Sequence, residues 1–380
     1  MAENLGRLPD YTCAQTTQRT RRHNPSRPFQ PVDTVRLEVA LVEGKELFGW
    51  PGDSKIAEPD LSQLIGSGGM MSNGSFALLA KGVFLSPATT FTFRGNAKLN
   101  GMAALRFDYK VPADASSYHL RVDSSDAVVA YHGSFWADPE SLDLERLEMT
   151  ADNIPDELGV SSTRDSMDYA RVKIGSSDFL LPKTSELTIA AQSGLEDRNR
   201  TEFHDCRQYA GESVLSFLDP EQIKPAAAAP APPVESALPP DFQADIVLQS
   251  PITSSSAVGD PVRAQLAHRI AVGRKVIFSK GAILSGHISQ LHRDEGWYHV
   301  AIALDDITAD RKHAGLSTRR NTLFLNGGIR EWFPGSPLQR GFLEHSAPSA
   351  GQIAVPAERP LNLKAGFRFT LRSRLLQSGK

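Results

Sequence analysis

Cysteine and histidine offer the widest chemistry in this chain, and they come close together in sequence at one place. His204 and Cys206 are separated by a single residue, so a β-strand would put both side chains on one face. There an imidazole could deprotonate the thiol and create a nucleophile. The alternative is a disulfide between Cys206 and Cys13, the only other cysteine, because both lie in polar sequence. We favour the disulfide, which requires an oxidising compartment, over a reactive thiol or two buried free thiols.

Metal binding is the second chemistry that the histidines raise. His287, His292 and His299 cluster with Asp294 and Glu295, but no helical His-x-x-x-His spacing occurs. On a hairpin that turns near residues 294–296, His287 and His299 would face each other. Solvated histidines are the preferred interpretation, so no metal and no cofactor is predicted. The chain also lacks a Gly-x-Ser-x-Gly elbow, and no catalytic residue is predicted.

Aromatic side chains point to binding rather than catalysis. Many of them fall in the N-terminal half, where they form either an ordinary core or the lining of an apolar cavity between a sheet and its helices. An ordinary core is the default interpretation, but a strongly curved sheet with few helices has difficulty filling its concave side, which makes the cavity a stronger alternative than usual. The candidate cavity residues are Phe76, Leu79, Phe91, Phe93, Phe107, Tyr109, Tyr118, Phe135 and Trp136.

The elements that position these side chains follow from their periodicity. Apolar residues alternate with polar ones through most of residues 89–218, with short turns between the runs, which predicts a curled antiparallel meander of about ten strands. Helices are expected over residues 9–22, 59–65 and 76–85. The last two would cover the concave side, with the glycines of 66–69 as the flexible joint of a movable lid.

A stretch rich in proline and alanine divides the chain. Residues 219–241 are predicted to be a semi-rigid linker, because alternating Pro and Ala favour polyproline II. Residues 1–218 are predicted to form a curved antiparallel sheet, a half-barrel with a few covering helices. Residues 242–380 are predicted to form a small β-barrel. The fold class is therefore mainly β.

Composition narrows the compartment and the partners. The 380 residues include 41 Lys and Arg against 44 Asp and Glu, and this net charge of −3 argues against nucleic acid as a partner. No run of about 18 apolar residues occurs, so no transmembrane segment is predicted. The first residues do not read as a secretory signal. A periplasmic or secreted location therefore assumes a mature form whose signal has been removed.

The first domain resembles the outer-membrane lipoprotein carrier superfamily over residues 9–218. The similar segments are Phe107-Asp-Tyr109-Lys-Val-Pro112, Tyr131-His-Gly133-Ser-Phe-Trp136-Ala-Asp138-Pro139, Leu142-Asp-Leu144-Glu-Arg-Leu147 and Phe179-Leu-Leu181-Pro182. The resemblance implies an incomplete β-barrel, lidded by helices around a hydrophobic cavity. No binding residue of that superfamily has a matching position here, and neither the cysteine pair nor the second domain belongs to the simple carrier.

The second domain resembles the β-barrel of TrbI-type conjugation and secretion-channel proteins over about residues 245–373. The similar pattern is Gly259-Asp260, then Val276-Ile-Phe278-Ser-Lys-Gly281-Ala-Ile-Leu284-Ser-Gly286-His-Ile288, and much later Val355-Pro356 and Leu363-Lys-Ala-Gly366-Phe-Arg-Phe369. This resemblance implies an assembly or scaffold role.

Together these features predict a non-enzymatic extracytoplasmic protein. Its N-terminal half-barrel would bind a lipid or another hydrophobic small molecule, and its C-terminal barrel would serve as a scaffold, with an envelope protein as a second candidate partner. The first alternative is a structural or protein-interaction component of the cell envelope. The second alternative is a hydrolase whose site is assembled only by the fold.

Overall fold

The chain is mainly β and divides into two compact units, Met1–Ala210 and Gly211–Lys380. The structure is a computed structural model that describes residues 5–6, 8–53, 56–65, 76–122, 125–209, 234–239, 241–294, 296–309, 312–316, 319–325 and 352–375. Most of the predicted linker lies outside these residues. Its described part includes strand β13 (Val234–Glu235), which pairs in parallel with β21 (Lys312–Gly315) of the second unit.

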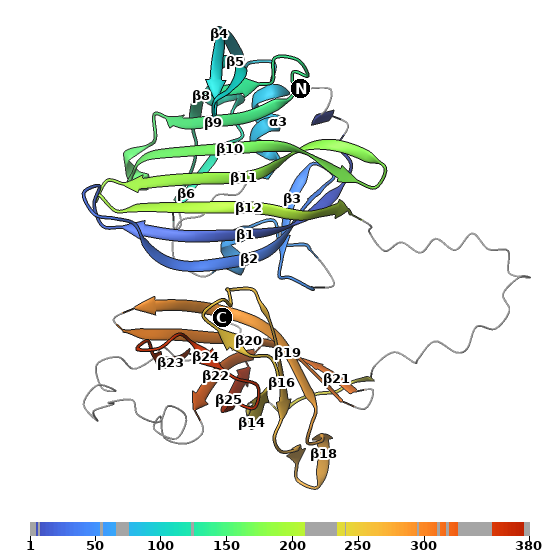
Figure 1. Ribbon diagram of the computed structural model, residues 1–380. Coiled ribbons are helices and arrows are strands. Elements are labelled where there is room, and N and C mark those ends of the chain that lie inside the picture. The colour runs from blue at the N-terminus through green and yellow to red at the C-terminus, as the bar shows by residue number, and fades with distance from the viewer. Residues whose placement is uncertain are drawn as a thin grey trace, which may run out of the picture. The chain divides into compact units, whose positions relative to one another are not determined.

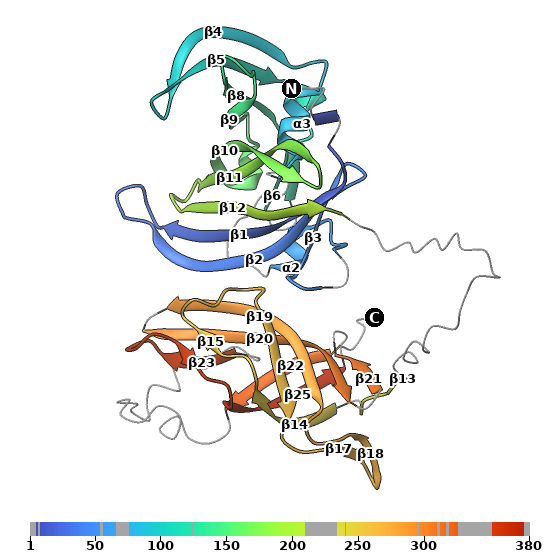
Figure 2. The same ribbon diagram turned by 45° about the vertical axis from the view of Figure 1, so that its right-hand side comes forward.

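The N-terminal unit is built on one antiparallel sheet of ten strands, in the order β3-β2-β1-β12-β11-β10-β9-β8-β5-β4. The sheet curls, with α3 on its inner side (Figures 1 and 2). The first and last strands of the unit lie side by side in the sheet, so its two edges are β3 and β4. The strands are β1 (Tyr11–Arg22), β2 (Gln30–Val42), β3 (Lys45–Gly49), β4 (Thr90–Leu99), β5 (Met102–Val111), β8 (Ala130–Ala137), β9 (Leu144–Asp152), β10 (Val160–Ile174), β11 (Ser177–Ala191) and β12 (Glu196–Gln208), with a separate pair β6 (His119–Val122) and β7 (Ser125–Val128). The predicted curved antiparallel sheet is confirmed, but only seven of its ten strands come from residues 89–218, where about ten are predicted.

The predicted helix over residues 9–22 is wrong, because this segment is strand β1. Its side chains alternate between the two faces of the sheet, and the buried set is Tyr11, Cys13, Gln15, Thr17 and Arg19. Polar residues within that buried set hide the alternation from a search for apolar periodicity. Accordingly, Arg19 is buried inside the sheet.

The described residues include two short helices, α2 (Leu61–Leu64) and α3 (Leu78–Phe84), and the glycine joint between them lies outside the described residues. Helix α3 covers the inner side of the sheet, as predicted (Figure 1). Helix α3 packs Leu79 and Val83 into the main core. The buried carboxylate of Glu46 on β3 accepts hydrogen bonds from the backbone N–H groups of Ala77 and Leu78, at 2.7 and 3.0 Å. Strand β3 thereby holds the start of α3.

Glycine is required at one position on the inner face. A Cβ atom at Gly133 on β8 would lie 1.8 Å from the carbonyl oxygen of Glu148 and 2.9 Å from the hydroxyl oxygen of Tyr109. That hydroxyl donates to the same carbonyl at 2.9 Å. The missing side chain lets the Tyr109 hydroxyl reach across β8 to the backbone of β9.

The C-terminal unit is a second curled sheet, in the order β13-β21-β20-β19-β16-β14-β25-β22, with β23 paired to β20 (Figure 2). Its interior is almost entirely aliphatic and aromatic, with Ile246, Leu284, Leu304 and Phe369 fully buried. The strands are β14 (Asp241–Leu248), β16 (Pro261–Leu266), β19 (Ile283–Asp294), β20 (Trp297–Ala309), β22 (Arg319–Leu325), β23 (Gln352–Pro356) and β25 (Arg368–Leu375), with two small pairs, β15 (Ile252–Thr253) with β24 (Asn362–Leu363) and β17 (Ile270–Val272) with β18 (Lys275–Phe278). This sheet occupies the residues for which a small barrel is predicted.

Within the described part of the chain, no helix combines the length and apolar character needed to cross a membrane.

Candidate ligand-binding face

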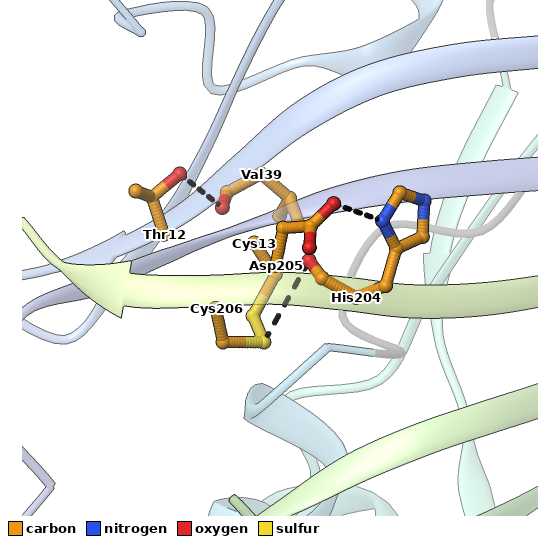
Figure 3. The surroundings of a disulfide bond; sticks show 6 residues. All are labelled: Thr12, Cys13, Val39, His204, Asp205 and Cys206. Carbon is orange, nitrogen blue, oxygen red and sulfur yellow. Dashed lines mark hydrogen bonds and ion pairs between the residues drawn. A yellow bond between two sulfur atoms is a disulfide. The ribbon is translucent and has the colours of Figure 1, made fainter. Parts of the chain in front are cut away.

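The two cysteines form a disulfide that joins β1 to β12 (Figure 3). Cys13 lies opposite a bulge in β12, where Asp205 takes a positive φ of 51° and its carboxylate contacts His204 Nδ1 at 2.7 Å. The bond links residues 193 apart in sequence, which are the first and last strands of the unit. The predicted disulfide is confirmed. The sulfur of Cys206 is therefore not available as a nucleophile activated by His204.

The nine predicted cavity residues do not lie together. Four are buried in the main core of the N-terminal unit: Leu79, Tyr109, Tyr118 and Phe135. Phe76 is buried at a different place, where its ring centroid lies 4.9 Å from that of Tyr11 and 5.2 Å from that of Phe203.

Trp136 lies on the opposite face of the sheet and is not part of the set. Neighbouring residues of a strand point to opposite faces, so Phe135 on the inner face places Trp136 on the outer face. There the guanidinium carbon of Arg106 lies 5.4 Å from its ring. The outer face also carries ion pairs, such as Arg146 with Asp168 at 2.7 Å. Trp136 therefore belongs to the charged outer surface.

The remaining predicted residues form an aromatic cluster on the inner face, next to the β4 edge. We define this cluster as Phe84 of α3, Phe91 and Phe93 of β4, Phe107 of β5 and Phe135 of β8. The ring of Phe107 lies 4.8 Å from that of Phe135 and 5.0 Å from that of Phe93, and Phe84 lies 5.1 Å from Phe135. Phe91 and Phe93 remain 46% and 57% exposed. The cluster thus runs from the buried core to the solvent at an open sheet edge.

Phe84 is the one member that the sequence analysis missed. Its ring stacks 6.1 Å from that of Phe91, and no other strand follows β4 at this edge. The signal in the sequence is the position of Phe84 near the end of the expected helix over residues 76–85, one helical turn after Ala80 of the core. Including the helix among the aromatic candidates would have found it.

Cross-strand register arranges the inner face in two continuous rows. Directly paired residues of neighbouring strands point to the same side, so each row can be followed across nine strands. The first row is Phe93, Phe107, Phe135, Leu147, Met167, Ser185, Thr201, Thr17 and Val35. The second row is Phe91, Tyr109, Gly133, Met149, Asp165, Leu187, Asn199, Arg19 and Asp33. Both rows begin with aromatic side chains and become mainly polar from β10 or β11 onward, although Leu187 lies within the polar part of the second row and Val35 ends the first.

The polar end of these rows is buried and hydrogen-bonded. The hydroxyls of Thr17 and Thr201 lie 2.9 Å apart, and Gln15 Nε2 donates to the Thr17 hydroxyl at 3.2 Å. Arg19 Nε donates to Asp33 Oδ1 at 2.6 Å, and Nη2 donates to the second carboxylate oxygen. The sequence pattern does not reveal this group, because polar residues occupy the buried face of β1 and because Thr17 meets Thr201, 184 residues away in the chain.

Burial controls the ionisation of four tyrosines in this unit. It raises the pKa of Tyr131 to about 12, and it raises the pKa values of Tyr11, Tyr109 and Tyr169 above the ordinary tyrosine value. Nearby carboxylates, such as Asp165 beside Tyr109 and Tyr169, add to the shift of the pKa. All four side chains therefore stay neutral at physiological pH, and the inner face carries no phenolate.

The predicted pairing of His287 with His299 in the C-terminal unit is wrong. His287 pairs with Ala303, and its Nδ1 lies 3.1 Å from Asp305. The hairpin instead sets His292 opposite His299, with ring centroids 4.9 Å apart. Within the described residues, no group of three or more His, Cys, Asp or Glu side chains is arranged to hold a metal ion.

Known proteins resemble this chain only in coarse fold. No family profile and no curated protein sequence matches it. A domain described as an outer membrane lipoprotein-sorting protein from Vibrio parahaemolyticus is 13% identical, with 56% of this chain and 92% of that chain covered and a TM-score of 0.32. A DUF1329 family protein from Desulfovibrio piger is 10% identical, covering 56% and 90%, with a TM-score of 0.29. ComB10 of the Com type IV secretion system of Helicobacter pylori is 16% identical, covering 34% and 84%, with a TM-score of 0.22.

Proposed function

We propose that the N-terminal unit binds a hydrophobic molecule, such as a lipid or an acyl chain, on the aromatic cluster at the β4 edge, and that it does so without catalysis. The supporting observation is the continuity of the cluster. Phe91 and Phe93 contact the core rings of Phe107 and Phe135, yet about half of each side chain remains exposed. A ligand that covers the exposed half would extend the core by one more layer.

Covering the exposed halves of these rings would contribute favourable free energy to binding. Burying a phenylalanine completely contributes about 1.5–3 kcal/mol, so covering the exposed half of one ring contributes about 1–1.5 kcal/mol. Aromatic rings also offer flat, rigid contact area at a low cost in conformational entropy. Contiguous exposed apolar surface of this kind is typical of binding sites rather than of ordinary protein surface.

The disulfide supports an extracytoplasmic location. Bonds of this type form and persist in oxidising compartments, which include the bacterial periplasm and the extracellular medium. Cys13 and Cys206 hold the first and last strands of the ligand-binding sheet together, so the proposed binding face depends on that environment. The C-terminal unit, with its apolar interior, is proposed to act as a scaffold or interaction module.

Fluorescence titration of the full chain with N-phenyl-1-naphthylamine tests the proposal. This probe is apolar and has no polar head, so it reports occupancy of a hydrophobic site alone. The wild-type chain is expected to bind it saturably. Phe93→Ala is expected to weaken binding about tenfold, because about 1.4 kcal/mol corresponds to a factor of ten. The double variant F91A/F93A is expected to weaken it further.

Val272→Ala is the matched control, since Val272 is 54% exposed but lies in the C-terminal unit. It should leave the affinity for the probe unchanged. Absence of saturable binding in the wild type, or equal binding by F91A/F93A, would contradict the proposal. Either result would favour a structural or interaction role for the protein in the cell envelope.

A further inference from the structure

The polar end of the inner face has no role in binding a purely hydrophobic molecule. We define the polar half of the face as Thr17 and Arg19 of β1, Asp33 of β2, Thr163 and Asp165 of β10, Ser185 of β11, and Asp197, Asn199 and Thr201 of β12. These side chains are almost completely buried. A buried polar group is costly unless it is hydrogen-bonded, and an apolar residue of similar size would make a simpler core.

Nη1 of Arg19 and the hydroxyl of Thr163, both in the polar half, have no hydrogen-bond partner within the part of the chain that is described. The two side chains are 5% and 0% exposed. Arg19 uses its other two donor nitrogens on Asp33. A ligand oxygen that accepts from Arg19 Nη1 would remove this cost.

The charges of the polar half indicate which kind of ligand oxygen it would bind. Arg19 pairs with Asp33, and Arg21 pairs with Asp197 at 2.6 Å. Asp165 adds a third carboxyl group, so the polar half and its neighbour Arg21 together hold two guanidinium groups and three carboxyl groups. The neighbouring groups are hydroxyls and amides, which bind uncharged oxygen atoms. An anionic group would meet repulsion here, whereas hydroxyl and ester oxygens would not.

We infer that the polar half binds the uncharged, oxygen-rich head of an amphiphile, such as a sugar or a glycerol ester, whose hydrocarbon chain lies on the aromatic cluster. This inference rests on the proposed function and adds the class of ligand to it. The two ends belong to the same rows: Phe107 and Ser185 are four strand spacings apart, about 19 Å along the sheet. Helix α3 packs over the aliphatic middle, so a bound chain lies beside this helix or displaces it.

Competition against bound N-phenyl-1-naphthylamine on the full chain tests the inference. The competitors share one decyl chain and differ only in the head: maltoside, phosphocholine, sulfate or trimethylammonium, each below its micelle-forming concentration. The wild type is expected to prefer the maltoside over the sulfate about tenfold, the factor that one or two net hydrogen bonds supply.

The key variant is T17V/T201V, which removes two hydroxyls while keeping the side-chain shape. It should reduce the preference for the maltoside at least threefold and leave the affinity for the apolar probe unchanged. The matched control T16V/T188V exchanges two threonines on the outer face of β1 and β11 and should preserve the preference. Arg19→Lys, which keeps a positive charge beside Asp33 but removes the Nη1 donor, should also reduce the preference.

The outcomes separate this inference from the proposed function. If the wild type binds the apolar probe but shows no preference among the heads, or if T17V/T201V keeps the full preference, the inference is overturned and the proposed function stands. The polar half would then be satisfied by water alone. If the apolar probe itself does not bind, the proposed function fails, and the inference fails with it.

Discussion

The two units of this chain are both curled sheets, but they fill their interiors with different chemistry. Among the described residues, the N-terminal unit buries twelve polar or charged side chains, whereas the C-terminal unit buries two, His287 and Thr370. The N-terminal unit also leaves Phe91 and Phe93 half exposed at a sheet edge. Stability alone favours the aliphatic interior of the C-terminal unit. We propose that the polar groups of the N-terminal interior serve binding rather than folding.

Removing the buried cation of the N-terminal unit should have the largest effect on stability. Arg19→Leu leaves the carboxylate of Asp33, which is 8% exposed, without its ion-pair partner. Breaking a buried pair in this way costs about 3–5 kcal/mol. Urea denaturation should show this loss in the N-terminal unit. The control Arg269→Leu, at an exposed arginine of the C-terminal unit, should change stability by about 0.5 kcal/mol or less. Equal losses for the two variants would break the contrast between the units.

Removing the disulfide should have the next largest effect, and only on the N-terminal unit. C13A/C206A releases a link between residues 193 apart. Disulfides typically contribute about 2–5 kcal/mol by limiting the unfolded chain. Calorimetry should show one transition moving to lower temperature and the transition of the C-terminal unit unchanged. A thiol reductant should act on the wild type in the same way and have no effect on C13A/C206A.

Replacing a glycine where two strands approach closely should destabilise the two units to a similar extent. A Cβ atom would lie 1.8 Å from Glu148 O at Gly133, and 2.0 Å from Ala303 O at Gly286 in the C-terminal unit. Gly133→Ala and Gly286→Ala should each destabilise their own unit by about 1–3 kcal/mol, the usual cost of overpacking. Gly315→Ala, where a Cβ atom would meet nothing within 4 Å, is the neutral control. If Gly133→Ala and Gly286→Ala cost clearly different amounts of stability, the units would differ in how tightly they pack rather than in the polarity of their interiors.

The smallest expected effect is a loss of stability of the N-terminal unit that is absent near neutral pH and appears only in alkaline solution. All four tyrosines whose pKa values are raised by burial lie in the N-terminal unit. Above about pH 10 the unfolded chain loses these protons while the folded unit keeps them, so unfolding releases protons and stability falls as pH rises. For Tyr131 the loss continues until its folded pKa of about 12. Circular dichroism together with phenolate absorbance should show the N-terminal unit unfolding as its tyrosines ionise.

A control variant makes this alkaline experiment specific. Tyr131→Phe should reduce the pH dependence, because the substituted ring has no proton to lose. Alkaline unfolding that begins in the C-terminal unit, or that is unchanged in Tyr131→Phe, would contradict the assignment of the effect to buried tyrosines.

The fold could be predicted from sequence wherever one face of a strand is apolar. The alternation in β2, β5 and β8 gave the ten-stranded sheet, and the two cysteines gave the disulfide. The prediction failed for β1, because Gln15, Thr17 and Arg19 occupy its buried face. Strand β1 contributes Thr17 and Arg19 to the polar half. Local rules of patterning are expected to fail at functional positions.

Only part of the candidate site could be predicted from the sequence. Trp136 was grouped with Phe135 by residue type, although strand alternation alone places the two on opposite faces. The cross-strand rows, by contrast, depend on register between distant strands. The pairing of Thr17 with Thr201 and of Arg19 with Asn199 joins the two ends of the unit. No local pattern in the sequence specifies that register.

Native mass spectrometry of the full chain, purified from an envelope fraction without detergent, tests the central claim most directly. We expect one bound amphiphile per chain, with a hydrocarbon chain and an uncharged head. F91A/F93A should lose this ligand, and the Val272→Ala control should keep it. A wild-type chain that is free of ligand, and that also takes up none of the added amphiphiles, would contradict the claim that the N-terminal unit is a binding domain.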